Sequence, residues 1–137
     1  MYDPMLVEPM RQEAVAAGCE EARTADEVHA AVKETEGAVL VFVNSVCGCA
    51  AGGARPGLTL ALAGDTSPEK AITVFAGNDR EATAAAREYF APYQPSSPQI
   101  GLLKGGELKW MLQRHDIEGR MPQEIAADIQ GALREHR

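Results

Sequence analysis

The sequence predicts an α/β fold, in which helices cover both faces of a mixed β-sheet. Segments with strand-like patterns alternate with helix-like segments along most of the chain, which favours parallel strands joined by crossover helices. The run Ala38–Val43 (Ala-Val-Leu-Val-Phe-Val) is continuously apolar, as in a central strand buried on both faces. Gly105 and Gly106 separate two later strand-like runs and predict an antiparallel hairpin.

The first 37 residues predict two helices and a short strand. Residues 4–18 form the first helix, because apolar residues recur at helical spacing and Gly18 ends it. Its expected apolar stripe is Leu6, Met10, Ala14 and Ala17. A short strand is expected within residues 19–23. The segment Thr24-Ala25-Asp26-Glu27 then has the spacing of a capping box and opens a helix that Gly37 stops.

The middle of the chain predicts a helix, a strand and a second helix. A crossover helix is expected over residues 50–64, with a kink near Pro56, although several glycines weaken the pattern in its first half. Ile72–Ala76 is a second buried strand. Residues 79–90 form the next helix, with Asp79 as its N-cap. Its apolar face is Ala82, Ala85, Ala86, Tyr89 and Phe90.

The last third predicts a hairpin followed by a helix. After a proline-rich loop over residues 91–97, Gln99–Leu103 is a strand, and residues 104–107 form the tight turn. The returning strand is expected to place alternate residues on one face: Leu108, Trp110 and Leu112. Pro122 suits the first turn of the final helix, whose expected stripe is Ile125, Ile129, Ala132 and Leu133.

Size and charge limit the classes of function. The chain has 137 residues, 45% of them hydrophobic and 24% charged, which suits one domain spanning residues 1–137. No stretch has the length of a membrane span or the pattern of a targeting peptide. The net charge is −7, with scattered basic residues, so neither nucleic acid nor an anionic membrane is expected as a partner. We expect a cytoplasmic protein.

Cys47 and Cys49 are the feature that carries chemistry. They follow the predicted central strand and precede the crossover helix, at the sheet edge where α/β active sites gather. The amides of a helix N-terminus favour thiolate over thiol, so Cys47 is the candidate attacking thiol and Cys49 the resolving thiol. The small ring that they close favours a readily reduced disulfide. The rest of the candidate active-site loop is Ser45, Val46 and Gly48.

A second interpretation of the Cys47–Cys49 pair remains open, in which the protein is a metal-binding or metallochaperone module. Two close thiolates suit zinc or copper(I), but a tetrahedral site needs further ligands. The remaining soft donors do not have ligand-like spacing; they are Cys19, His29, His115 and His136. Three cysteines cannot supply a four-cysteine iron–sulfur cluster within one chain. No metal ligand is assigned, and Cys19 is most simply a packed side chain.

The sequence resembles the bacilliredoxins, which are thioredoxin-like proteins with a Cys-Gly-Cys active site. The two segments that carry the resemblance most specifically are Asn44-Ser45-Val46-Cys47-Gly48-Cys49-Ala50-Ala51 and Arg114-His115-Asp116-Ile117-Glu118-Gly119-Arg120. It extends over nearly the whole chain: Met1–Arg23, Val39–Gly57, Thr73–Gly77, Tyr93–Gly106 and Arg114–Arg120. The resemblance, like the predicted order of elements, implies a thioredoxin-like three-layer α/β/α sandwich with a mixed sheet and an extra N-terminal helix.

The resemblance also implies a reaction. Members of this family remove bacillithiol from proteins that carry it as a mixed disulfide. Carried over, Cys47 attacks the mixed disulfide on S-thiolated cytosolic proteins, and Cys49 or a second bacillithiol resolves the adduct. No cofactor is implied beyond the redox-active Cys47–Cys49 disulfide, with bacillithiol or another low-molecular-weight thiol as co-substrate. A general protein disulfide reductase or isomerase remains an alternative.

The segment from Ser97 to Glu107 is similar to the part of thioredoxin that places a cis-proline beside the active site. This similarity predicts a cis peptide bond at Pro98 and implies that Ser97 and Pro98 bind an extended substrate. The sequence also departs from thioredoxin. Val41 stands where thioredoxin has a buried aspartate, and Val46 replaces the tryptophan before the first cysteine. The proton-handling scheme of thioredoxin is therefore not expected here.

Overall fold

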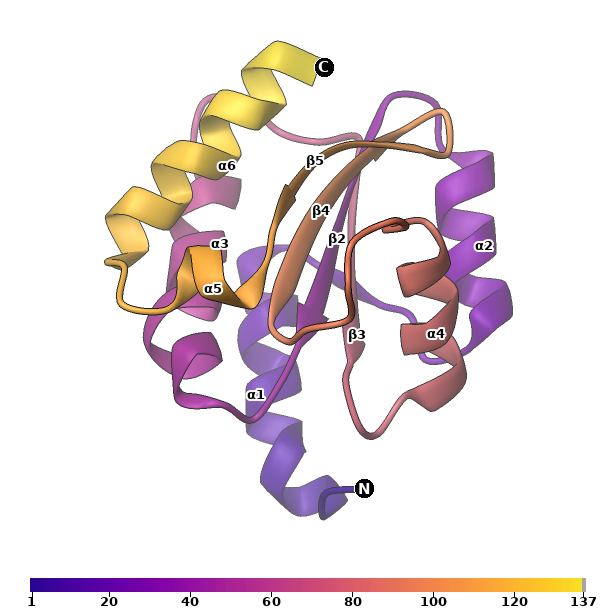
Figure 1. The fold of residues 1–137 in the computed structure, drawn as a ribbon, viewed down its shortest axis with the longest axis vertical. Coiled ribbons are helices and arrows are strands. Elements are labelled where there is room, and N and C mark those ends of the chain that lie inside the picture. The colour runs from indigo at the N-terminus through magenta and orange to yellow at the C-terminus, as the bar shows by residue number, and fades with distance from the viewer. Residues whose placement is uncertain (137) are drawn as a thin grey trace.

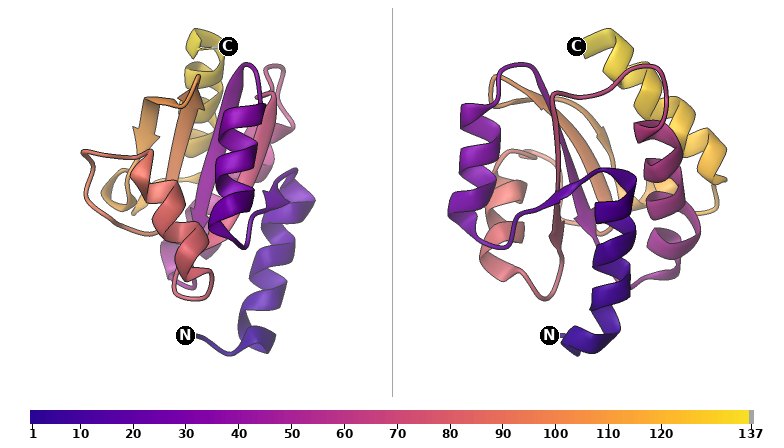
Figure 2. Two further views of the ribbon diagram at one scale, coloured as in Figure 1. Left: turned by 90° about the vertical axis from the view of Figure 1, so that its right-hand side faces the viewer. Right: turned by 180° about the vertical axis from the view of Figure 1, so that it is seen from behind.

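The computed structural model describes residues 1–136 and contains one five-stranded mixed sheet with helices on both faces (Figures 1 and 2). The strands are β1 (Glu20–Glu21), β2 (Ala38–Asn44), β3 (Lys70–Phe75), β4 (Gln99–Lys104) and β5 (Glu107–Leu112). The helices are α1 (Pro4–Ala17), α2 (Ala25–Glu34), the π-helix η1 (Ala50–Ala54), α3 (Arg55–Leu62), α4 (Arg80–Glu88), α5 (Arg114–Ile117) and α6 (Pro122–His136). The short helix α5 was not expected from the sequence.

The strand order is β1-β3-β2-β4-β5. β1 and β2 run parallel to β3, whereas β4 runs antiparallel to both β2 and β5. Two parallel crossovers followed by an antiparallel hairpin is the thioredoxin-like sandwich that the sequence predicted. α1, α3 and α6 cover one face of the sheet, and α2 and α4 cover the other (Figure 1).

β2 is the centre of the core. Each of its seven residues is buried, because Leu40 and Phe42 pack on the side of α1, α3 and α6 while the valines between them pack on the side of α2 and α4. The prediction from the continuous apolar run, a strand covered on both faces, is therefore confirmed. The final helix buries its predicted stripe, Ile125, Ile129, Ala132 and Leu133.

The register of the two central strands brings two loops to one edge of the sheet. Val43 near the end of β2 pairs with Gln99 at the start of β4. The residues that follow β2 and the residues that precede β4 consequently leave the sheet at the same edge. This edge carries the cysteine loop and the segment that ends at Pro98.

The crossover helix over residues 50–64 is present, but its first five residues are π-helical. The N–H of Arg55 bonds to the carbonyl of Ala50, five residues earlier, and regular α-helix begins at Arg55. Pro56 has no N–H with which to bond the carbonyl of Gly52, so the wider turn falls immediately before the proline. The irregularity predicted near Pro56 takes the form of this π-helix.

The predicted single face of β5 was wrong. Trp110 and Leu112 pack with the core on the side of α3 and α6, whereas Leu108 packs on the side of α2 and α4. The cause is a bulge: Trp110 pairs with Leu102 but Leu108 pairs with Leu103. Lys109 is thus an extra residue that interrupts the alternation.

The buried face of α1 also differs from the prediction. Val7, Arg11 and Ala14 are buried, while Leu6 is 52% exposed. The reason is an ion pair, because the guanidinium of Arg11 donates two hydrogen bonds, of 2.8 and 2.7 Å, to the buried carboxylate of Asp79. Asp79 occupies the predicted N-cap position of α4, but its carboxylate bonds to Arg11 and to the Phe75 N–H and makes no side-chain cap bond.

Two turn predictions were confirmed. Thr24 caps α2, since its hydroxyl accepts a hydrogen bond of 3.1 Å from the Glu27 N–H. The hairpin turn uses Gly105 and Gly106 with φ of +61° and +77°, a conformation that favours glycine at both positions.

Candidate active site

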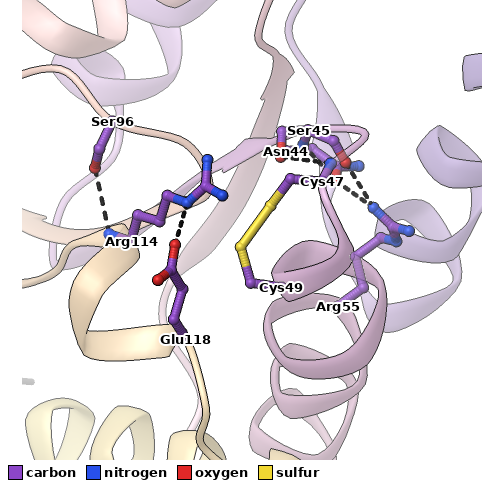
Figure 3. Close-up of a disulfide and its surroundings, with 8 residues drawn as sticks. All are labelled: Asn44, Ser45, Cys47, Cys49, Arg55, Ser96, Arg114 and Glu118. Atoms are coloured by element: carbon purple, nitrogen blue, oxygen red, sulfur yellow. Dashed lines mark hydrogen bonds and ion pairs between the residues drawn. A yellow bond between two sulfur atoms is a disulfide. The ribbon is translucent and has the colours of Figure 1, made fainter.

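Cys47 and Cys49 form a disulfide at the head of the crossover helix (Figure 3). The carbonyl of Cys47 accepts hydrogen bonds from the N–H groups of Ala50 at 3.0 Å and Ala51 at 3.2 Å, so helical hydrogen bonding begins at Cys47. Both cysteines are half-buried and Gly48 between them is exposed. The pair therefore lies where the sequence predicted, at a helix N-terminus beyond the end of β2.

A buried polar network fixes the start of the cysteine loop. The side-chain oxygen of Asn44 accepts hydrogen bonds from the Ser45 N–H at 2.9 Å and from Arg55 at 3.0 Å. Its amide nitrogen donates to the carbonyl of Met10 at 3.0 Å. The Ser45 hydroxyl in turn accepts from the Cys47 N–H at 3.3 Å. The sequence analysis placed Ser45 in the active-site loop but assigned no role to Asn44, which connects this loop to α1.

Arg55 belongs to that network. Its side chain is almost fully buried, donates to the Ser45 carbonyl at 2.9 Å and pairs with Glu13 at 3.1 Å. Arg55 thus fixes the backbone at the start of the cysteine loop through its bonds to Asn44 and to the Ser45 carbonyl. Because Arg55 is buried and paired with Glu13, its role is to fix the loop, and its charge is not free to attract an anionic thiol.

A second charged pair faces the disulfide from the other side. Arg114 in α5 and Glu118 just after it form an ion pair, and both side chains are about half exposed. Figure 3 shows the Arg114 side chain extending from its segment toward the side of the disulfide and the Glu118 side chain extending toward Arg114. The Arg114 N–H also donates to the Ser96 hydroxyl at 3.3 Å, which joins this segment to the loop before β4. The resemblance pointed to this segment without assigning it a role.

A cleft of about 320 Å³ opens beside Cys49. One wall is helical, and the other is the segment that links α5 to α6. The residues that line it are Gly48, Cys49, Gly52, Gly53, Ile117, Glu118, Gly119 and Arg120. The disulfide is therefore bordered by a space of small-molecule size.

The other candidate residues lie at the same sheet edge. Val46 is half-buried within the cysteine loop. Ser97 is half-buried, Pro98 is buried, and the peptide bond between them is cis, as predicted. They immediately precede β4, whose first residue pairs with Val43.

Cys19 is separate from this site. It is a free thiol, 4% exposed, packed in the core. Burial raises the pKa of this thiol to about 12, because desolvation disfavours the thiolate. Cys19 is consequently the packed side chain that the sequence suggested.

The described part of the chain contains neither a cluster of metal ligands nor a helix that could span a membrane. Within residues 1–136, no three His, Cys, Asp or Glu side chains come together as a metal site, so the metal-binding interpretation finds no third ligand there. Over the same residues, none of the helices has the length and apolarity needed to cross a membrane.

The fold and the cysteine pair together define a thiol–disulfide oxidoreductase of the thioredoxin-like type. Comparison with known proteins agrees with this class, since the sequence model of the disulphide isomerase family matches residues 2–137. A bacilliredoxin of Koribacter versatilis is 54% identical over 127 residues, covering 93% of this chain and 88% of the relative. A bacilliredoxin of Bacillus licheniformis is 52% identical over 136 residues, covering 98% and 94%. One from Geobacillus kaustophilus is 50% identical over 133 residues, covering 96% and 92%. This chain belongs to the bacilliredoxin family.

Proposed function

We propose that this protein is a redoxin that removes bacillithiol, or a similar small thiol, from S-thiolated proteins of the cytoplasm. Cys47 is the attacking thiol and Cys49 the resolving thiol. The observation that carries the proposal is the half-buried Cys47–Cys49 disulfide at a helix N-terminus, next to a cleft of small-molecule size. The proposed redox group is this cysteine pair, and the proposed substrates are the S-thiolated protein and the low-molecular-weight thiol.

The position of Cys47 favours the nucleophilic role. The first N–H groups of a helix have no intrahelical acceptors, and together with the helix dipole they stabilise negative charge at the N-terminus. Cys47 precedes the first turn, whereas Cys49 lies within it and packs against the hydrophobic core. After reduction of the pair, the thiolate forms preferentially on Cys47, and the thiolate is the attacking species.

The first step transfers the small thiol. The Cys47 thiolate attacks the bacillithiol sulfur of the mixed disulfide, a new S–S bond forms to Cys47, and the bond to the substrate protein breaks. The electron pair of that broken bond leaves with the substrate sulfur, which is released as a thiolate and takes up a proton. The substrate cysteine is thereby reduced, and the redoxin carries bacillithiol on Cys47.

The second step releases the small thiol. The Cys49 thiolate attacks Cys47 Sγ, which forms the Cys47–Cys49 disulfide and expels bacillithiol as a thiolate. Two small-thiol molecules then return two electrons to the pair and leave as their own disulfide. Direct attack of a second bacillithiol on the adduct is the alternative route to the same reduced Cys47.

Trapping the adduct tests the assignment. A Cys49→Ser variant incubated with a bacillithiolated protein is expected to gain the mass of one bacillithiol on Cys47, because the resolving sulfur is absent. Cys19→Ser is the matched control and should cycle like the wild type. Peptide mass spectrometry locates the adduct. Finding it on Cys19, or finding none while the substrate stays thiolated, would contradict the proposal.

General disulfide reduction or isomerisation is the second candidate, favoured by the name of the matched family. The two candidates differ in substrate. Release of a small thiol from a mixed disulfide should be much faster than reduction of insulin under the same conditions if the first proposal holds. The reverse order of rates would favour the second.

A further inference from the structure

We infer that the cleft beside Cys49 is the subsite that holds the small-thiol part of the mixed disulfide, and that Gly52 sets the size of thiol it admits. This inference rests on the proposed function. It adds a recognition site and a specificity-determining residue to the chemistry of the cysteine pair.

The position of the cleft suits a thiol bonded to Cys47. Cys49 and Gly48 line it, so a group that is attached to Cys47 and lies in the cleft passes next to the resolving sulfur. The volume of about 320 Å³ is at the small end of the range typical of ligand sites. It matches a low-molecular-weight thiol and is far smaller than a folded protein.

Two of the glycines that line the cleft are required by the fold. A Cβ on Gly53 would lie 3.2 Å from Ile125 Cδ1 and 3.4 Å from Ile117 Cγ2, so its missing side chain allows the helix to pack against α6. Gly119 has φ of +73°, a left-handed conformation that other residues rarely adopt. Local structure explains both residues.

Gly52 has no such explanation. Its φ is not positive, and a Cβ built on it would meet nothing within 4 Å. A glycine within a helix costs about 1 kcal/mol relative to alanine. Folding alone would therefore favour a side chain at this position. The same holds for Gly48, one turn earlier on the same side of the helix.

Gly48 and Gly52 leave open space along the helical wall of the cleft. Filling that space would narrow the cleft without disturbing the core, since the added carbon meets nothing within 4 Å beyond the adjoining backbone of its own helix. The opposite wall carries the half-exposed carboxylate of Glu118, which is paired with Arg114. A thiol larger than cysteine, with an ammonium for Glu118 and a carboxylate for Arg120, which also lines the cleft, fits a cleft with this size and these charges.

Substitution of Gly52 tests the subsite. Release of bacillithiol from a fluorescent peptide mixed disulfide should slow about tenfold in Gly52→Ala and further in Gly52→Leu, because one added carbon in a fitted pocket changes binding by about that factor. Release of cysteine from the same peptide should change less than about threefold, because cysteine leaves the far part of the cleft empty.

Gly131 provides the matched control. It is also a helical glycine whose added Cβ meets nothing within 4 Å, but it lies in α6 and does not line the cleft. Gly131→Ala and Gly131→Leu should release both adducts at the wild-type rate. If the Gly52 variants slow both adducts equally, or neither, the subsite is wrong while the redoxin function stands. If the wild type releases neither adduct, the function and the subsite fail together.

Discussion

At the scale of single residues, the contrast between Cys19 and Cys47 shows how surroundings decide what a thiol does. Cys19 is held in the core, where its pKa is raised to about 12 by burial. Cys47 lies half-exposed at a helix N-terminus, where negative charge is favoured. Among the three cysteines of the chain, these surroundings favour thiolate chemistry at Cys47 over Cys19.

The raised pKa of Cys19 predicts a loss of stability in alkali. Above about pH 9 the unfolded chain releases the thiol proton while the folded chain keeps it up to about pH 12. The free energy of unfolding should consequently fall by up to about 1.4 kcal/mol for each pH unit in this window. Cys19→Ala lacks this contribution.

Urea denaturation of the wild type and of Cys19→Ala between pH 8 and pH 11 measures this contribution. Over that range the wild type should lose about twice the per-unit value of unfolding free energy relative to Cys19→Ala. The other titrating groups are common to both proteins and cancel in the comparison. Parallel stability curves for the two proteins would show that Cys19 titrates alike in the folded and unfolded states.

At the scale of elements, periodicity and turn chemistry predicted the sheet because its signals are local. The apolar run of β2 and the Gly-Gly turn each depend on neighbouring residues alone. The errors have one origin, contacts between different elements of the fold. The bulge at Lys109 depends on how β5 meets β4, and Asp79 bonds to Arg11 in place of its own helix. No pattern within either segment indicated these contacts.

The Arg11–Asp79 pair attaches α1 to the loop before α4. Arg11→Met would leave a buried carboxylate without its cation, which costs about 3–5 kcal/mol of unfolding free energy. The double variant Arg11→Met with Asp79→Asn should recover part of that loss, because it removes the uncompensated charge. Denaturant unfolding of the single and double variants measures both values. A loss below about 1 kcal/mol in Arg11→Met would mean that the pair behaves as a surface ion pair.

At the scale of the whole molecule, sequence reasoning located the reactive pair but not its surroundings. Cys47 and Cys49 stand out because a single residue separates them. The apolar run that forms β2 precedes them and fixes the sheet edge where they lie. The network around Asn44 joins α1, the cysteine loop and α3, while Glu118 reaches the site from the segment after β5. Such convergence is a property of the fold as a whole, so spacing in the chain could not reveal it.

The fold should be nearly as stable with the pair reduced as with it oxidised. A disulfide that closes a ring of three residues removes little entropy from the unfolded chain, about 1.6 kcal/mol on the chain-entropy estimate. Unfolding free energies measured with and without reductant should differ by no more than about 2 kcal/mol. The Cys47→Ser, Cys49→Ser double variant should show no dependence on reductant. A much larger loss on reduction would mean that the disulfide holds the structure together.

The cysteine pair and the β4–β5 turn lie at opposite ends of β4. The strand begins at the cysteine edge with Gln99 and ends beside the turn at Gly105 and Gly106, the far end of the hairpin in Figure 1. Neither glycine has a neighbouring atom within 4 Å of an added Cβ. A dye, a surface tether or a fused reporter attached at this turn would lie at the far end of the hairpin. It would leave access to Cys47 and Cys49 unobstructed.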